Sequence, residues 1–162
     1  MQIQRADEAV FMLWQPRIAE LFDASVKINF PGFAVSDSYG SDKCDEVASY
    51  IKDGSAIVFL AVEQDKLAGW IWCHQIQRLS ERRLHIAEIA VAEDFRRHGI
   101  GNALLNTVEE WARKNGYAEI DLLVTAGNSG AIGFYEQASY TPERFLMKKT
   151  IKRESDAQNM EN

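Results

Sequence analysis

Apolar residues recur with two different periods along the chain, and the switches between them predict the order of the elements. Residues 1–5 alternate as a β-strand does, and a spacing of three and four residues then predicts a helix that Asp7 caps. Pro16 lies inside this helical pattern and is expected to kink or split the helix near Gln15. The N-terminal part of the chain is therefore predicted to be a strand followed by a broken helix.

A proline-, glycine- and serine-containing stretch at 29–40 is typical of a long loop, after which Ser41 or Asp42 is expected to cap a second helix. The remaining predicted elements are strands at 56–62, 67–76, 84–92 and 118–124, helices at 99–115 and 128–137, and a last strand or pair of strands at 140–151. A charged turn is expected at 78–83.

This order, a hairpin meander followed by a strand–helix–strand crossover, predicts a mixed sheet with helices on both faces. The expected fold class is therefore α/β in the three-layer sense, with one domain over residues 1–151. Residues 152–162 are polar, which predicts a disordered tail.

Composition and charge limit which partners, compartment and metal sites the protein is expected to have. The 162 residues are 46% hydrophobic and 26% charged with a net charge of −6, which disfavours nucleic acid as a partner and favours a cationic one. Two separated cysteines fit a reducing compartment, no His/Cys cluster has metal-ligand spacing, and the longest apolar run, 56–62, is too short to span a membrane. The N-terminus has no secretory pattern. We therefore expect a cytoplasmic protein without a metal.

The segment with the clearest chemistry joins the strand ending at Ala92 to the next helix, and it contains Arg96, Arg97, His98, Gly99, Ile100, Gly101 and Asn102. The first turn of a helix offers unpaired N–H groups and a partial positive charge to an anion. Two glycines allow close approach to that backbone, and two arginines add cations. The alternative is an ordinary turn with solvated arginines. The segment lacks the Gly-Lys-Ser/Thr of a Walker loop and the third glycine of a dinucleotide fingerprint.

Two motifs in this order resemble those of the GNAT superfamily of N-acyltransferases. The first is Arg96-x-x-Gly99-x-Gly101, preceded by Ile89-Ala90-Val91, and the second is Asn128-x-x-Ala131-x-x-Phe134-Tyr135. The element order along residues 1–151 also matches that fold. Ser139-Tyr140 departs from the Gly-Phe that often follows the second motif in the family.

The resemblance implies an N-acetyltransferase that uses acetyl-CoA to acetylate a small-molecule amine by direct attack. It assigns the pantetheine arm to the backbone of Ile89, Ala90 and Val91, with the Val91 N–H facing the developing oxyanion, and the pyrophosphate to residues 96–102. It places Asn128, Ala131 and Phe134 along the same arm. Tyr135 is the implied acid for the leaving thiolate, and packing on the helix is the alternative.

The general base is expected on the strand at 84–92, where Glu88 and His85 are the candidates. Strict alternation puts them on opposite faces, but a bulge, as GNAT strands often carry, would change that parity. We favour Glu88, because a carboxylate in an apolar strand is costly unless it is paired or used. Pairing with Arg83 and a base made of His85 or a water relay are the alternatives.

The acceptor pocket is expected between the 29–40 loop and the meander. Its candidate residues are Phe30, Tyr39, Trp72, His85 and Glu88, with Phe33, Trp70 and His74 on the same walls. For the tryptophans, core packing is the alternative. A protein terminus or lysine is the alternative acceptor, an acyl-CoA-binding sensor without turnover is the alternative outside the enzyme class, and a homodimer is the assembly to be tested.

Overall fold

The computed structural model describes residues 1–151, so the predicted polar tail at 152–162 lies outside the described residues. One five-stranded sheet has the order β1-β2-β3-β4-β5, in which the first four strands pair antiparallel and β4 pairs with β5 in parallel. The strands are β1 (Gln2–Arg5), β2 (Ala56–Glu63), β3 (Lys66–Arg78), β4 (Glu81–Val91) and β5 (Glu119–Leu122). The helices are α1 (Glu8–Asn29), α2 (Tyr39–Lys52), α3 (Ile100–Lys114) and α4 (Ser129–Gln137), with a 3-10 turn at Glu93–Phe95. The predicted mixed sheet is confirmed.

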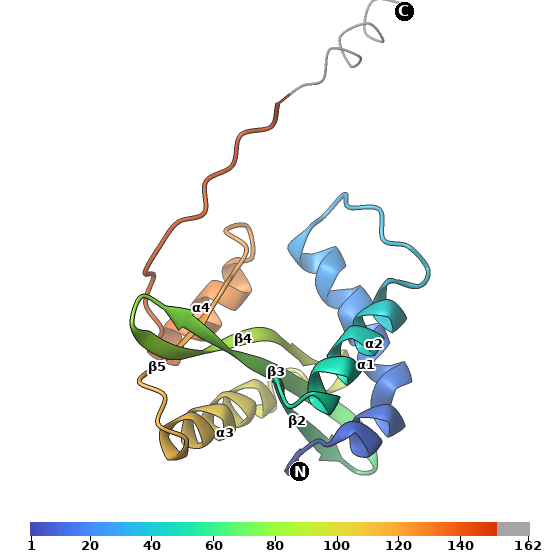
Figure 1. Cartoon of the computed structure of the whole chain (residues 1–162). Coiled ribbons are helices and arrows are strands. Elements are labelled where there is room, and N and C mark those ends of the chain that lie inside the picture. The colour runs from blue at the N-terminus through green and yellow to red at the C-terminus, as the bar shows by residue number, and fades with distance from the viewer. Residues whose placement is uncertain (152–162) are drawn as a thin grey trace, which may run out of the picture.

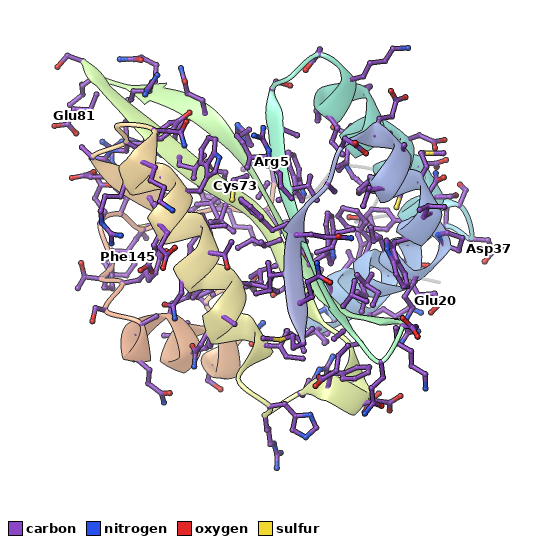
Figure 2. The ribbon with its side chains drawn as sticks, turned by 90° about the horizontal axis from the view of Figure 1, so that it is seen from below. Arg5, Glu20, Asp37, Cys73, Glu81 and Phe145 are labelled. Atoms are coloured by element: carbon purple, nitrogen blue, oxygen red, sulfur yellow. The ribbon has the colours of Figure 1, made fainter. Side chains whose placement is uncertain are left out.

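Helices cover both faces of the sheet, which confirms the three layers (Figures 1 and 2). The face under α1 and α2 buries Phe11, Phe22 and Trp70 in one core cluster. The face under α3 buries Leu104, and Cys73 lies in the sheet on that side (Figure 2). The short strand β5 at the edge extends the sheet toward α4. Two cores separated by one sheet are what the alternating apolar strands require.

The helix α1 continues through Pro16, so the predicted split near Gln15 is wrong, and the kink stays a prediction. A proline removes the hydrogen bond to the carbonyl four residues earlier. That carbonyl belongs to Met12, a residue that is 45% exposed. The predicted N-cap is confirmed, since Asp7 Oδ1 accepts from Val10 N at 2.8 Å.

The second helix begins at Tyr39, inside the predicted loop and before the predicted caps at Ser41 and Asp42. The reason is contact between helices. A Cβ on Gly40 would collide with the backbone carbonyl of Ala19 in α1, so this glycine permits close helix packing. From composition alone, Gly40 is typical of a loop residue.

Two further predictions need correction. Strands β3 and β4 extend to Arg78 and Glu81, which leaves only Leu79 and Ser80 in the turn predicted at 78–83. Residues 140–151 form no strand at all. Their apolar, branched composition favours a strand only when a neighbouring strand supplies hydrogen bonds and packing. Within residues 1–151, no helix combines the length and apolarity needed to cross a membrane.

Candidate active site

A β-bulge at Ala87 decides which side chains of β4 share a face. Trp72 pairs with Glu88 and Cys73 with Ile86, so Ala87 has no partner in β3. Ile86 packs with the α3-side core and so does Ile89, three residues later rather than the two or four that alternation requires. The bulge that the GNAT resemblance implied is therefore present. Strict alternation is wrong, and His85 and Glu88 lie on the same face, toward α1 and α2.

Glu88 is the most perturbed carboxyl of the site. Ser25 of α1 donates its hydroxyl to Glu88 Oε1 at 2.7 Å. Burial disfavours the charged carboxylate and raises the pKa of Glu88 to about 7, although the Ser25 hydrogen bond opposes the shift. The expected alternative of an ion pair with Arg83 is wrong, because Arg83 binds other carboxylates. A carboxyl poised near neutral pH is suited to proton transfer.

Tyr135 of α4 lies close enough to Glu88 to feel its charge. Burial is the main cause that raises the pKa of Tyr135 to about 12, and the negative charge of Glu88 adds to it. The ring packs beside Phe134 and Tyr140, with centroids 5.2 and 5.8 Å away. Tyr135 is therefore a protonated hydroxyl at neutral pH, set in an apolar surrounding next to a carboxyl.

The end of β4 has a free backbone edge. Parallel pairing with β5 stops at Ile86 and Leu122, so residues 87–91 have β3 as a partner on one side only. Ala92 N donates to Ala68 O of β3, and because strand N–H groups alternate in direction, the Val91 N–H points away from β3. Consistently, the Val91 carbonyl accepts from Arg96 Nε at 3.3 Å on that side. The second half of β4 therefore presents this backbone edge beyond the end of β5.

The turn before α3 has the geometry of an anion site. Arg97 and Gly99 both adopt left-handed backbone conformations, with φ of 64° and 78°. Such conformations at alternate residues turn successive N–H groups into one concavity. No side chain caps α3. A left-handed φ at a non-glycine residue such as Arg97 costs about 1–2 kcal/mol.

The residues of this turn have different surroundings. Arg96, Arg97, His98, Gly99 and Asn102 are exposed, whereas Ile100 is buried. Nothing lies within 4 Å of a Cβ built on Gly99, so this backbone can be approached from outside. A Cβ on Gly101 would instead lie 3.1 Å from the Phe134 ring. The missing side chain of Gly101 therefore makes room for α4, and the approach of a phosphate to this backbone stays a prediction. The cradle of free amides and arginines still fits a phosphate-bearing group.

Asn128 caps α4, the helix predicted to begin at residue 128, and links it to α1. Its Oδ1 accepts from Ala131 N at 3.0 Å, and its Nδ2 donates to Asn29 Oδ1 at 2.9 Å. Asn29 in turn donates to the Ser25 carbonyl at 3.1 Å. Ser25 and Asn29 were not predicted. Their signal in the sequence is two small polar residues four apart on an otherwise apolar helix side.

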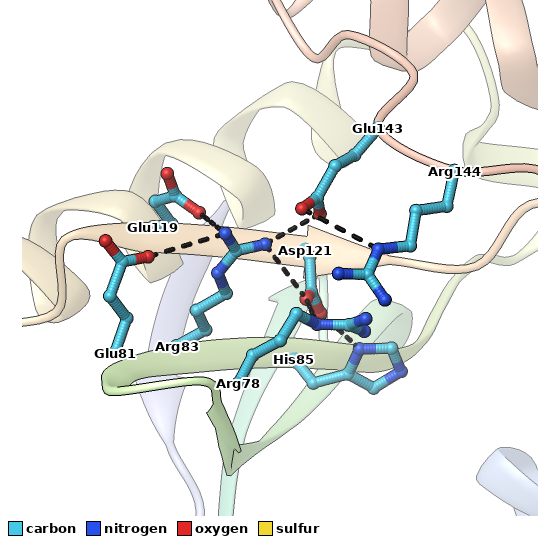
Figure 3. Close-up of polar contacts among 8 residues, drawn as sticks. All are labelled: Arg78, Glu81, Arg83, His85, Glu119, Asp121, Glu143 and Arg144. Atoms are coloured by element: carbon cyan, nitrogen blue, oxygen red, sulfur yellow. Dashed lines mark hydrogen bonds and ion pairs between the residues drawn. The ribbon is translucent and has the colours of Figure 1, made fainter.

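His85 belongs to a charged cluster at the start of β4 (Figure 3). Its Nδ1 lies 2.5 Å from Asp121 Oδ1, directly opposite in β5. Arg78 Nε is 3.5 Å from the other oxygen of Asp121, and Arg83 Nη1 is 3.9 Å from it. Asp121 was not predicted, because its position opposite His85 depends on a strand register that the sequence does not show. The carboxylate orients the imidazole in the way that supports a base.

A row of rings continues from His85 along the same face. The His85 and His74 centroids are 5.2 Å apart, His74 and Trp72 are 5.6 Å apart, and Tyr50 of α2 stacks on Trp72 at 6.0 Å. An open groove of about 660 Å³ borders this row. It is lined by Arg5, Glu46, Tyr50, Gly54, Ser55, Ile57, Trp72, His74, Gln75, Trp111 and Tyr117. The structure thus places Trp72 beside a groove and opposite Glu88.

The other predicted pocket residues are more scattered. Phe30 and Phe33 are 57% and 60% exposed in the loop after α1. Tyr39 packs partly against the α1–α2 core. Trp70 is fully buried between Phe11 and Phe22, so the core alternative is correct for this tryptophan.

Comparisons with known proteins agree with this geometry. The chain is 41% identical over 69 residues to an uncharacterised N-acetyltransferase of Methanocaldococcus jannaschii, a match covering 42% of this chain and 30% of that protein. It is 32% identical over 97 residues to streptothricin acetyltransferase A of Bacillus subtilis, covering 60% of this chain and 53% of the relative. The chain thus spans about a third of the first of these relatives and about half of the second.

A similar fold occurs in the crystal structure of an aminoglycoside acetyltransferase from a soil metagenomic sample. The TM-score is 0.71, with 19% identity over 94% of this chain and 96% of that one. The model of the acetyltransferase (GNAT) family matches residues 19–140. The chain therefore belongs to the GNAT family of acetyltransferases.

Proposed function

We propose that this protein transfers an acetyl group from acetyl-CoA to a primary amine of a small molecule, which attacks the thioester directly. The observation that carries the proposal is the proximity of Glu88 and Tyr135 near the free edge of β4. One group has a pKa of about 7 and the other a pKa of about 12, so a base and an acid coexist at neutral pH.

The cofactor is assigned to the turn before α3, the edge of β4 and the start of α4. The amides and arginines of residues 96–102 hold the pyrophosphate, and the free edge of Ile89, Ala90 and Val91 holds the pantetheine arm as an added strand would. Ala131 and Phe134 line the arm, and Asn128 faces it from the start of α4. When bound, the cofactor supplies an acetyl group activated as a thioester.

Side chains of this protein carry out the proton transfers. Glu88 accepts a proton from the ammonium of the acceptor, directly or through a water, and His85 held by Asp121 is the second candidate for this step. The Val91 N–H donates toward the oxygen on which negative charge develops. The Tyr135 hydroxyl gives its proton to the departing sulfur. Because the amine attacks directly, no cysteine nucleophile takes part.

Three observations support a small cationic acceptor. The net charge is −6, and the rings of Tyr50 and Trp72 line the groove. Aromatic faces attract ammonium groups. A streptothricin acetyltransferase among the relatives and an aminoglycoside acetyltransferase with the same fold give precedents for such substrates. A protein terminus or lysine is the competing acceptor. The buried, unpaired cysteines Cys44 and Cys73 support a cytoplasmic setting.

A screen of amines tests the proposal, with acetyl-CoA as donor and the released CoA thiol as the readout. Cys44 and Cys73 are buried, so the protein itself gives a low thiol background. The panel contains aminoglycosides, polyamines, amino sugars, amino acids, and peptides with a free terminus or lysine. Turnover of a small amine with Glu88→Gln inactive is the expected result. If only peptides are acetylated, the acceptor is a protein amine. If no amine in the panel is acetylated, the result favours an acyl-CoA-binding sensor without turnover.

Cofactor binding is tested separately by Arg97→Glu. We expect the dissociation constant of acetyl-CoA to rise about tenfold or more, since one guanidinium contact is replaced by repulsion. Arg113→Glu, an equal charge change at the far, exposed end of α3, is the matched control. Equal affinity of the two variants for acetyl-CoA would show that the pyrophosphate does not bind at this turn.

A further inference from the structure

A chain of hydrogen bonds runs from the start of α4 through the end of α1 to Glu88. Ala131 N donates to Asn128 Oδ1 at 3.0 Å, and Asn128 Nδ2 donates to Asn29 Oδ1 at 2.9 Å. Asn29 Nδ2 donates to Ser25 Oγ at 3.3 Å, and the Ser25 hydroxyl donates to Glu88 Oε1 at 2.7 Å. Every donor points toward the carboxyl, so each bond in the chain strengthens the next.

Asn29 is the residue through which the two helices are joined. Its hydrogen bond to Asn128, 99 positions away in the sequence, is the only one between α1 and residues 128–137 within the described chain. Figure 1 shows these two helix ends next to each other. The bond is not needed to end α1, because Phe30 N donates to Val26 O there. The Asn29 side chain therefore does more than cap its own helix.

On the cofactor side, Asn29 fixes the orientation of the Asn128 amide. The oxygen of that amide accepts from Ala131 N and one of its N–H groups donates to Asn29, so the amide cannot rotate without losing a bond. The second N–H has no partner within residues 1–151. The pantetheine arm assigned to this position has amide carbonyls that accept from such a donor. Holding the donor in place before the cofactor arrives lowers the cost of binding.

On the base side, Asn29 holds the hydroxyl that supports Glu88. Burial raises the pKa of Glu88 to about 7, and the Ser25 hydrogen bond opposes this shift because it favours the ionised carboxylate. The amide of Asn29 donates to the Ser25 oxygen, which leaves the Ser25 hydrogen directed at the carboxylate. The other polar side chains that face Glu88 carry no positive charge from α4 or β3; they are Tyr135 of α4, Trp72 of β3 and His85 of its own strand.

We propose that Asn29 is a positioning residue with two roles: its oxygen orients the Asn128 amide for the pantetheine arm, and its nitrogen holds Ser25 on Glu88. This inference rests on the proposed function, because it assigns Asn29 a role toward acetyl-CoA and toward the base. The loss of this one side chain should therefore change two properties that belong to residues of different elements, the affinity for the cofactor and the ionisation of the base.

Two measurements on Asn29→Ala test both roles without any acceptor amine. Calorimetry gives the dissociation constant of acetyl-CoA, which should rise about three- to tenfold, as expected for the loss of one supporting hydrogen bond. The carboxyl carbon signal of Glu88 in protein labelled with carbon-13 glutamate, identified by its absence in Glu88→Gln, gives the midpoint of ionisation by NMR. That midpoint should move to higher pH by about half a pH unit, because the Ser25 hydrogen bond is weakened.

Double variants separate positioning from a general loosening of α1. Because Asn29 acts on Glu88 through Ser25, adding Asn29→Ala to Ser25→Ala should move the Glu88 midpoint no further than Ser25→Ala alone does. In the same way, adding Asn29→Ala to Asn128→Ala should leave the dissociation constant of acetyl-CoA at the value of Asn128→Ala. A residue that only stabilises the helix would instead give effects that add.

Gln15→Ala is the matched control, since it removes an amide hydrogen bond of 2.8 Å from the same helix to Asp45 of α2. It should leave the acetyl-CoA affinity and the Glu88 midpoint unchanged. If the wild type binds acetyl-CoA but Asn29→Ala leaves both quantities unchanged, or if the double variants are additive, or if Gln15→Ala gives equal shifts, the inference is wrong while the proposed function stands. A wild type that does not bind acetyl-CoA would overturn the proposed function and this inference together.

Discussion

Replacing Glu88 with glutamine should make the protein less active and, at alkaline pH, more stable. The isosteric amide keeps an oxygen that accepts from Ser25 but carries no charge. In the wild type, burial raises the pKa of Glu88 from 4.5 to about 7. The folded state therefore binds a proton more tightly than the unfolded state. The wild type accordingly loses stability as pH rises through the window from 4.5 to 7.

The size of the effect follows from the shift. At about 1.4 kcal/mol per pKa unit, ionisation of Glu88 costs the folded state about 3 kcal/mol above this window. The free energy of unfolding of Glu88→Gln minus that of the wild type should therefore increase by about 2–3 kcal/mol from pH 5 to pH 8. For a chain of this length that corresponds to roughly 5–10 °C in the difference of Tm.

Thermal or urea unfolding at pH 5, 6, 7 and 8 measures this difference directly. Glu110→Gln, on the exposed side of α3, is the matched control and should show no such trend. Turnover of Glu88→Gln should fall by about 100-fold or more, and the acidic limb of the wild-type rate profile, centred near pH 7, should disappear. A Tm difference that stays constant with pH would refute the buried, perturbed carboxyl, whatever the activity.

Three further outcomes test other parts of the structure. Tyr135→Phe should lower kcat about 10- to 100-fold while the KM for acetyl-CoA changes less than about twofold, and equal kcat in a steady-state assay would take the acid role from Tyr135. Gly40→Ala should cost about 2–3 kcal/mol in urea unfolding because a methyl group meets the backbone of α1, whereas Gly133→Ala, with open space around it in α4, should be neutral or slightly stabilising. Ser25→Ala should raise the pKa of Glu88 further and move the acidic limb to higher pH, and an unmoved limb would show that the limb belongs to another group.

The sequence predicts well those parts of the site that are local in the chain. The turn at 96–101 and the cap at Asn128 depend on neighbouring residues, and both are found where the motifs indicate them. Strand and helix order is also recovered, since it depends on periodicity over short windows.

Features that depend on contact between distant segments could not be predicted. The start of α2 is set by Gly40 against α1, and the partner of His85 is set by the register of β5. Ser25 reaches Glu88 from 63 residues away. The strand expected at 140–151 fails for the same reason, because strand propensity is expressed only where a neighbouring strand is present.

The bulge at Ala87 divides β4 into two halves that are out of phase by one residue. Before it, even-numbered positions such as Leu84 and Ile86 belong to the α3-side core, and after it odd-numbered positions such as Ile89 do. A redesign of the acceptor site must therefore use one alternation rule before Ala87 and the opposite rule after it. Deleting this single alanine would remove the bulge and leave one regular alternation along the strand, because Ile86 and Glu88, which already lie on opposite faces, would then be neighbours.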